Sequence, residues 1–156
     1  MFKTLLLIGS GSFIGGIARY VLGKLAQEQA ALDFPLGTLL VNVSGCFIIG
    51  VIYGFSAKEL VNEDWRFFLA TGLCGGYTTF SSFSYENIAM LREGETAAFF
   101  LYVSLSLIFG LLATWLGIIC TKADKLLIVK QQLWQPEPRL RFQCVLAHPS
   151  PATLLL

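Results

Sequence analysis

The sequence predicts an all-α integral membrane protein with four transmembrane helices, the third of which is broken in mid-membrane. The 156-residue chain is 55% hydrophobic and only 13% charged, and its mean hydropathy is +0.68. An ordinary soluble domain is about one quarter charged, so a soluble chain of this size would lack the charges to cover its surface. Four apolar stretches also reach the roughly 20 residues that a helix needs to cross a bilayer.

The four expected spans cover about residues 4–25, 36–57, 66–91 and 97–121. The polar links AQEQAALDFP, KELVNED and REGET separate them. Pro35 suits the first turn of the second helix, where its missing N–H costs little. The first stretch resembles a signal peptide. However, Arg19 soon follows and no small-x-small cleavage site precedes a soluble domain, so we interpret it as the first membrane helix.

Residues 122–156 differ in character from the spans. They hold most of the prolines and scattered charges without clear periodicity, so we expect a poorly ordered tail. Up to Lys130, six lysines and arginines lie on the side of the two chain ends and two on the other side, which favours both ends in the cytoplasm. Without the lysines of the tail the balance is three to two and decides nothing.

Glycine spacing predicts how the helices pack. Gly11-x-x-x-Gly15 in the first span and Gly50-x-x-x-Gly54 in the second form faces of small residues that let helix backbones approach closely in lipid. The segment GSGSFIG (9–15) is no dinucleotide-binding loop, because it lacks the last glycine of that motif and opens no βαβ unit.

The chain lacks the residues that several classes of function need. The net charge of +1 gives no basic surplus for nucleic acid. The four cysteines form no C-x-x-C pair and His148 is the single histidine, so a zinc site or a Cys–His nucleophile pair has no support. We therefore predict neither an enzyme nor a nucleic-acid partner.

An interruption in the third span, GGYTTFSSFSYE (75–86), is the least lipid-like stretch of the spans. The preceding residues add a further glycine, which gives three glycines in five positions, and each weakens a helix by about 1 kcal/mol relative to alanine. A helix broken in mid-membrane offers carbonyls to a cation and amides to an anion. A glycine kink that merely aids packing would leave the same pattern, and this stretch alone does not separate the two.

A helical wheel divides the residues after the interruption into two faces. Phe80, Phe83 and Ser84 share one face; Thr79, Ser82 and Glu86 share the other. Phenylalanines three apart often only pack in a core. Aromatic rings also have a positive edge, which can replace part of the water around a small anion without a fixed charge that would hold the anion too tightly.

Polar groups also lie at membrane depth in the other spans. Asn42 sits in the second span, with Thr38 and Ser44 nearby. Tyr102, Ser106 and Thr114 form a hydroxyl stripe along the fourth. Such a stripe suits an anion, although serine and threonine hydroxyls often bond only to their own helix.

Two charges fall inside the spans, and intramembrane charges indicate function by default. Away from the ends of the spans, Arg19 is the only cation and Glu86 the only acid. Three roles of Arg19 are compatible with the sequence: it gathers anions at an aqueous vestibule, it extends to the membrane interface, or it pairs with Glu86.

Three motifs together closely resemble the Fluc, or CrcB, family of fluoride channels. They are Gly15-x-x-x-Arg19 in the first span, GTLLVNVSG (37–45) in the second and TGLCGGYTTFSSFS (71–84) in the third. The resemblance covers residues 1 to about 121. It implies a bacterial inner-membrane protein of four helices that assembles as an antiparallel, dual-topology homodimer and passively exports fluoride from the cytoplasm.

The resemblance also implies roles for particular residues. Phe80 and Phe83 match the phenylalanines of the family's pore, and Asn42 matches its pore asparagine. The backbone carbonyls of Gly75 and Thr78 match those that hold a structural sodium ion at the dimer centre. The remaining matches are the polar track of the fourth span at Tyr102, Ser106 and Thr114, the fluoride pathway at Ser81 and Ser84, and the vestibule charges Arg19 and Glu86.

Two features depart from the family pattern. Gly110 stands where related sequences can carry a further hydroxyl, which shortens the polar track. The tail after about residue 122 resembles nothing in the family, and its lysines could bias the orientation of the chain.

The main alternative is a small four-helix multidrug/proton antiporter. Such a carrier needs a membrane-embedded acid, and Glu86, towards the end of a span, is the single candidate. A membrane scaffold without transport activity is a second alternative, but it gives no reason for polar groups that are costly in lipid.

Overall fold

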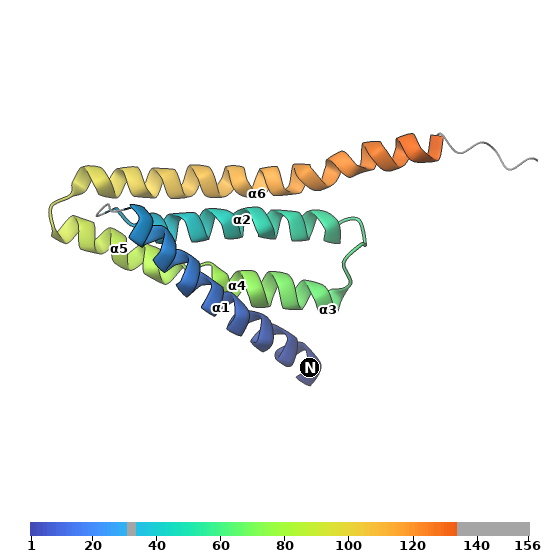
Figure 1. Ribbon diagram of the computed structural model, residues 1–156, viewed down its shortest axis with the longest axis horizontal. Coiled ribbons are helices and arrows are strands. Elements are labelled where there is room, and N and C mark those ends of the chain that lie inside the picture. The colour runs from blue at the N-terminus through green and yellow to red at the C-terminus, as the bar shows by residue number, and fades with distance from the viewer. Residues whose placement is uncertain (31–33, 134–156) are drawn as a thin grey trace, which may run out of the picture.

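The computed structural model describes residues 1–30 and 34–133, which are almost entirely helical and contain no strand. The elements in chain order are α1 (Phe2–Ala30), α2 (Leu36–Ser56), α3 (Glu63–Arg66), the π-helix η1 (Phe67–Cys74), α4 (Gly75–Tyr77), α5 (Phe80–Arg92) and α6 (Thr96–Leu133). Figure 1 shows that α2 and α6 run side by side in the same direction. The elements α3, η1, α4 and α5, which lie between α2 and α6 in the sequence, form a row that runs back in the opposite direction. The long helix α1 crosses this row obliquely.

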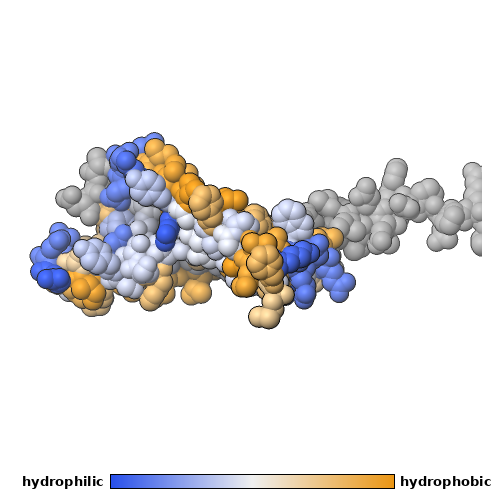
Figure 2. All heavy atoms as spheres, turned by 90° about the horizontal axis from the view of Figure 1, so that it is seen from below, coloured by the Kyte–Doolittle hydropathy of each residue, from blue (hydrophilic) through white to orange (hydrophobic). Residues whose placement is uncertain are grey.

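Three helices are long and apolar enough to cross a membrane. They cover Phe2–Gln29, Leu36–Ser56 and Thr96–Lys122 and confirm the first, second and fourth expected spans. Large side chains such as Phe13 and Leu111 are 70% and 73% exposed on these helices, as suits surfaces that face lipid. In Figure 2 the hydrophilic residues gather towards the ends of the molecule, with apolar and near-neutral residues between them. The chain is therefore a multi-pass membrane protein.

The expected third span, 66–91, is not one continuous helix. It is divided among the end of α3, η1, α4 and α5, with Thr78 and Thr79 in extended conformation between the last two. The eight-residue π-helix has no signature that we read in the sequence; wide turns of this type often lie next to functional sites.

The interruption differs in place from the prediction. We expected the glycines to break the helix from Gly75 to Thr78, but Gly75 and Gly76 are both helical. Gly76 is needed for close packing: a Cβ at this position would lie 2.5 Å from the carbonyl oxygen of Ser12 in α1. Glycine lets the row touch α1, and the helix ends at the next residue, Tyr77.

Both predicted glycine faces are confirmed as packing surfaces. Gly11 and Gly15 lie directly against the backbone of η1 and the start of α4, where a Cβ would clash with main-chain atoms. Gly50 lies against the backbone of Thr114 in α6, and Gly54 against the side chain of Thr121. These contacts make α1 with η1, and α2 with α6, the two most extensive helix pairs.

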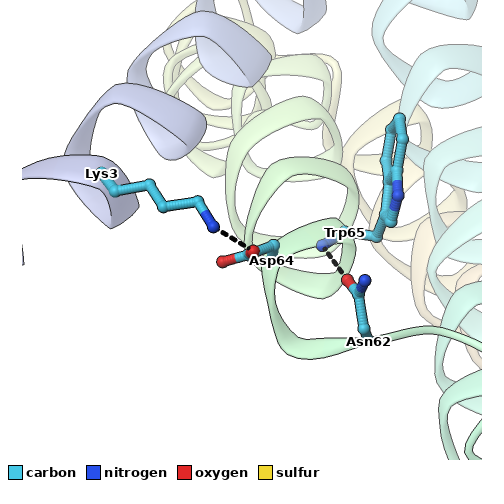
Figure 3. Close-up of polar contacts among 4 residues, drawn as sticks. All are labelled: Lys3, Asn62, Asp64 and Trp65. Atoms are coloured by element: carbon cyan, nitrogen blue, oxygen red, sulfur yellow. Dashed lines mark hydrogen bonds and ion pairs between the residues drawn. The ribbon is translucent and has the colours of Figure 1, made fainter.

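The row of short helices is anchored at its start by polar contacts (Figure 3). The side chain of Asn62 caps α3 by accepting a hydrogen bond of 3.0 Å from the amide of Trp65. The ammonium group of Lys3 in α1 lies 2.5 Å from Asp64. Both side chains are largely exposed, so this ion pair positions α1 against α3 but adds little to the stability of the protein.

Helix α6 continues to Leu133, past the expected end of the fourth span at residue 121. The apolar, membrane-crossing part of α6 ends at Lys122, close to that expected boundary. The rest of the predicted tail, residues 134–156, lies outside the described residues.

Candidate functional site

The two extended residues of the third span are held by Asn42 of α2. Its side-chain NH2 donates to the Thr79 carbonyl at 3.0 Å, and its oxygen accepts from the Thr79 amide at 2.8 Å. One amide side chain thus satisfies both backbone groups of a residue that no helix satisfies. Unpaired backbone groups at membrane depth each cost several kcal/mol, so Asn42 stabilises the interruption.

The same contact frees a carbonyl one turn earlier. In a continuous helix the Thr79 amide would donate to the carbonyl of Gly75, four residues before it. Here it donates to Asn42 instead. Gly75 is itself exposed. It therefore lies at the surface of the described chain, and its carbonyl does not receive the helical hydrogen bond from Thr79.

Thr79 also starts the next helix. Its hydroxyl accepts a hydrogen bond of 3.2 Å from the amide of Ser82, which makes it the N-cap of α5. The hydroxyls of Ser81 and Ser82 lie 3.1 and 3.2 Å from the same oxygen. The predicted pathway residue Ser81 thus belongs to a hydroxyl cluster at this cap.

A cavity of about 480 Å³, here called the polar cavity, opens on one side of Thr79. Its lining comes from α1, α2 and the start of α5, and includes Arg19, Lys24, Thr38, Thr79, Ser82 and Glu86. Arg19 and Glu86 share this cavity, and the three ion pairs found in residues 1–30 and 34–133 do not join them. Arg19 therefore lies on the wall of a polar cavity beside Glu86, and its role as a vestibule charge stays a prediction.

Glu86 is held by hydrogen bonds rather than by a cation. One carboxylate oxygen accepts from the hydroxyl of Thr38 at 2.5 Å, and the other accepts from the hydroxyl of Tyr102 at 2.7 Å. Tyr102 is fully buried. Glu86 therefore ties α5 to both α2 and α6.

A second cavity of about 310 Å³, here called the aromatic cavity, lies on the other side of the interruption. Five predicted site residues line it, together with Thr79 and Cys46: they are Asn42, Thr78, Phe80, Phe83 and Ser106. The Phe80 and Phe83 rings lie 5.8 Å apart, tilted by 38°, and Phe83 lies 5.1 Å from the ring of Tyr102. Phe80 is 79% exposed, so little of the described chain covers its ring.

Ser106 contributes a hydroxyl without a partner to the aromatic cavity. Its oxygen is buried and has no hydrogen-bond partner among the described residues. A buried polar group in this state calls for an explanation such as a ligand. The other hydroxyls of the predicted pathway are occupied locally: Ser84 donates to the Phe80 carbonyl at 2.8 Å and Thr114 to the Gly110 carbonyl at 3.1 Å.

The helical wheel of α5 agrees with this division. Thr79, Ser82 and Glu86, which were expected on one face, all line the polar cavity. Phe80 and Phe83, expected on the other, line the aromatic cavity. Tyr102 contacts both groups through Glu86 and Phe83. Thr114 lies apart, against Gly50 at the contact of α2 and α6, and Gly75, Ser81 and Ser84 also line neither cavity.

Sequence reasoning left three residues of the site unassigned. Thr38 binds Glu86 and lines the polar cavity, and its spacing of four from Asn42 could have placed both on one face of a helix. Thr79 lines both cavities, and a threonine directly before a serine-rich helix start is a capping signal. Lys24 lies just inside the expected end of the first span and lines the polar cavity.

Comparison with known proteins gives consistent matches over most of the chain. Residues 6–118 match the family described as "CrcB-like protein, Camphor Resistance (CrcB)". The chain is similar to the fluoride-specific ion channel FluC of Flavobacterium psychrophilum, with 43% identity over 121 residues that cover 77% of this chain and 98% of that relative. The protein of the same name from Prosthecochloris aestuarii is 45% identical over 117 residues, 74% of this chain and 91% of the relative.

Proposed function

Because the chain belongs to the family of CrcB-like proteins, we propose that it is a fluoride channel of the bacterial inner membrane. In this proposal fluoride leaves the cytoplasm passively, which lowers its concentration there. The relatives are named fluoride-specific ion channels, which supports fluoride as the transported ion. The single observation that carries the proposal within this chain is that two cavities of opposite character meet at Thr79.

The polar cavity serves as the entrance. Arg19 and Lys24 supply positive charge there, and charge of one sign in a cleft raises the local concentration of the opposite ion. Glu86 would repel an anion, but its two carboxylate oxygens both hold hydrogen bonds from hydroxyl groups. Fluoride gathers beside the two cations and meets the hydroxyls of Thr79 and Ser82.

The aromatic cavity serves as the narrow part of the path. The rings of Phe80 and Phe83 and the unpartnered hydroxyl of Ser106 line it. Ring edges and a hydroxyl replace water around a small anion without a full positive charge, so the ion can leave again. Asn42 acts by holding Thr79 between the two cavities.

The segment Glu63–Arg92 forms the remaining membrane crossing in this proposal. Its apolar, glycine-rich first half packs on α1, and its second half carries the two faces that line the cavities. With α1, α2 and α6 it makes four crossings, the third of them interrupted at Thr78 and Thr79.

The carbonyls of Gly75 and Thr78 would hold a structural sodium ion between two antiparallel copies. Their chemistry fits, because neutral carbonyl oxygens are hard ligands that suit a small cation. Gly75 is exposed, and its carbonyl lacks its helical donor because the Thr79 amide donates to Asn42 instead. A sodium ion would supply a fixed positive charge there, which offsets the exposed carbonyls of two interrupted helices.

Reconstitution in liposomes tests the function directly. Liposomes loaded with fluoride and carrying the purified protein should release it to a fluoride electrode, while empty liposomes retain it. Liposomes loaded with chloride should release far less. No fluoride release from an intact protein would overturn the proposal, and chloride release at a similar rate would overturn its selectivity.

A further inference from the structure

One step is missing from the hydroxyl stripe of α6. Tyr102, Ser106 and Thr114 follow a spacing of four residues, and Gly110 occupies the step between the last two. Positions four apart in a helix lie one above the other on the same face. Between Ser106 and Thr114, α6 itself thus offers no side-chain donor.

Cys46 of α2 lies opposite this gap. A Cβ built on Gly110 would be 3.6 Å from the Cys46 sulfur, which is ordinary contact. The next contacts along the same helix pair, Gly50 with the Thr114 backbone and Gly54 with the Thr121 side chain, leave no room for a side chain at either glycine. The thiol at Cys46 is therefore held in place by a seam that fixes the register of α2 against α6.

Cys46 also shares the aromatic cavity with Ser106. The Ser106 hydroxyl oxygen is buried and has no partner in the described part of the chain. An orphaned hydroxyl in a cavity is satisfied when a ligand enters. The thiol thus lies beside an independently marked ligand position, with Phe80 and Phe83 on the same lining.

We propose that the Cys46 thiol takes the place in the stripe that Gly110 leaves open and lines the route of fluoride beyond Ser106. This inference rests on the proposed fluoride channel. A thiol is a weak hydrogen-bond donor, so it can contact the anion without holding it. The route is then lined by α2 as well as by α6.

Substitutions at Cys46 separate a donor from a packing group, because the two roles predict opposite orders. A donor role predicts that Cys46→Ser keeps or raises fluoride efflux, while Cys46→Val lowers it by at least about threefold through loss of one hydrogen bond. A packing role predicts the reverse, since valine is apolar like the thiol and serine is not. Cys120→Val, at an exposed position of α6, should leave efflux unchanged.

A rescue experiment provides a second arm without added bulk at position 46. Cys46→Ala should lower efflux, and Gly110→Ser in the same chain should restore it, because the serine hydroxyl then fills the step from α6. Failure of the serine to restore efflux, or wild-type efflux in Cys46→Val, would overturn the inference. Each variant is measured in fluoride-loaded liposomes beside its thermal unfolding midpoint, so that a loss of folding is recognised.

The wild-type protein separates this inference from the proposed function. Absence of fluoride efflux in the wild type would overturn the channel itself. Robust wild-type efflux that ignores every change at Cys46 would leave the channel intact and remove only the role of the thiol.

Discussion

Asn42 shows how much of the interruption depends on one side chain. It satisfies both the amide and the carbonyl of Thr79 across 37 residues of sequence. The side chain thereby decides where the third span stops being a helix. The resemblance places Asn42 in the pore, and the structure adds the physical reason for an amide here, since only Asn and Gln side chains offer a donor and an acceptor side by side.

Substitution of Asn42 tests this role. Asn42→Ala should lower the thermal unfolding midpoint and abolish fluoride efflux, because two backbone groups lose partners at a cost of about 1–3 kcal/mol each. Asn42→Asp keeps the acceptor but loses the donor to the Thr79 carbonyl, so its effect on stability should fall between wild type and Ala. Equal stability of all three proteins would contradict the role.

Substitutions of the two phenylalanines should differ in their effect on protein stability but not in their effect on fluoride efflux. Phe80→Ile and Phe83→Ile should each abolish fluoride efflux while the protein elutes as the wild type does in size-exclusion chromatography. Phe80 is 79% exposed and Phe83 packs on Tyr102, so only the second change should lower the unfolding midpoint clearly. Wild-type efflux in both variants would show that the rings only pack.

At the scale of elements, length and periodicity made the first, second and fourth spans and the two faces of α5 predictable. The place of the interruption was not predictable, because it depends on the tertiary contact of Asn42 with Thr79. The glycine content predicted a break that begins at Gly75, three residues before the extended segment begins at Thr78. The π-helix before it escaped prediction for a similar reason: its wide turns accompany close contact with α1. The cavities also follow from packing between elements, which periodicity does not encode.

Neighbouring glycines of α1 offer a matched test of the helix packing. Gly15→Ala should destabilise the protein, because its Cβ would overlap the Leu73 carbonyl and lie 2.8 Å from the Tyr77 amide. Gly16→Ala meets nothing within 4 Å and should be neutral or slightly stabilising, since alanine favours a helix by about 1 kcal/mol. Thermal unfolding in detergent gives both values. Similar midpoints for the two variants would count against the close backbone contact.

At the scale of the whole molecule, orientation in the membrane is weakly encoded outside the C-terminal segment. Helix α6 carries the chain beyond Lys122, and the lysines from Lys122 onward turn a three-to-two balance into six to two. We therefore predict that these lysines act as a charge signal that sets the orientation of the chain.

Truncation after Thr121 tests that signal. Full-length chains should place a C-terminal reporter mostly in the cytoplasm, whereas truncated chains should place it on both sides in comparable amounts. Paired fusions to a reporter active only in the cytoplasm and one active only outside measure the ratio. An unchanged ratio would show that other residues set the orientation.

The contact of Asn42 with Thr79 also has a genetic consequence. Asn42 recognises main-chain atoms, and every amino acid except proline carries the same ones. In a library of all single substitutions selected on fluoride, position 79 should therefore accept other capping residues such as serine or aspartate, while position 42 should accept almost nothing. Position 79 should therefore vary under selection, whereas position 42 should not.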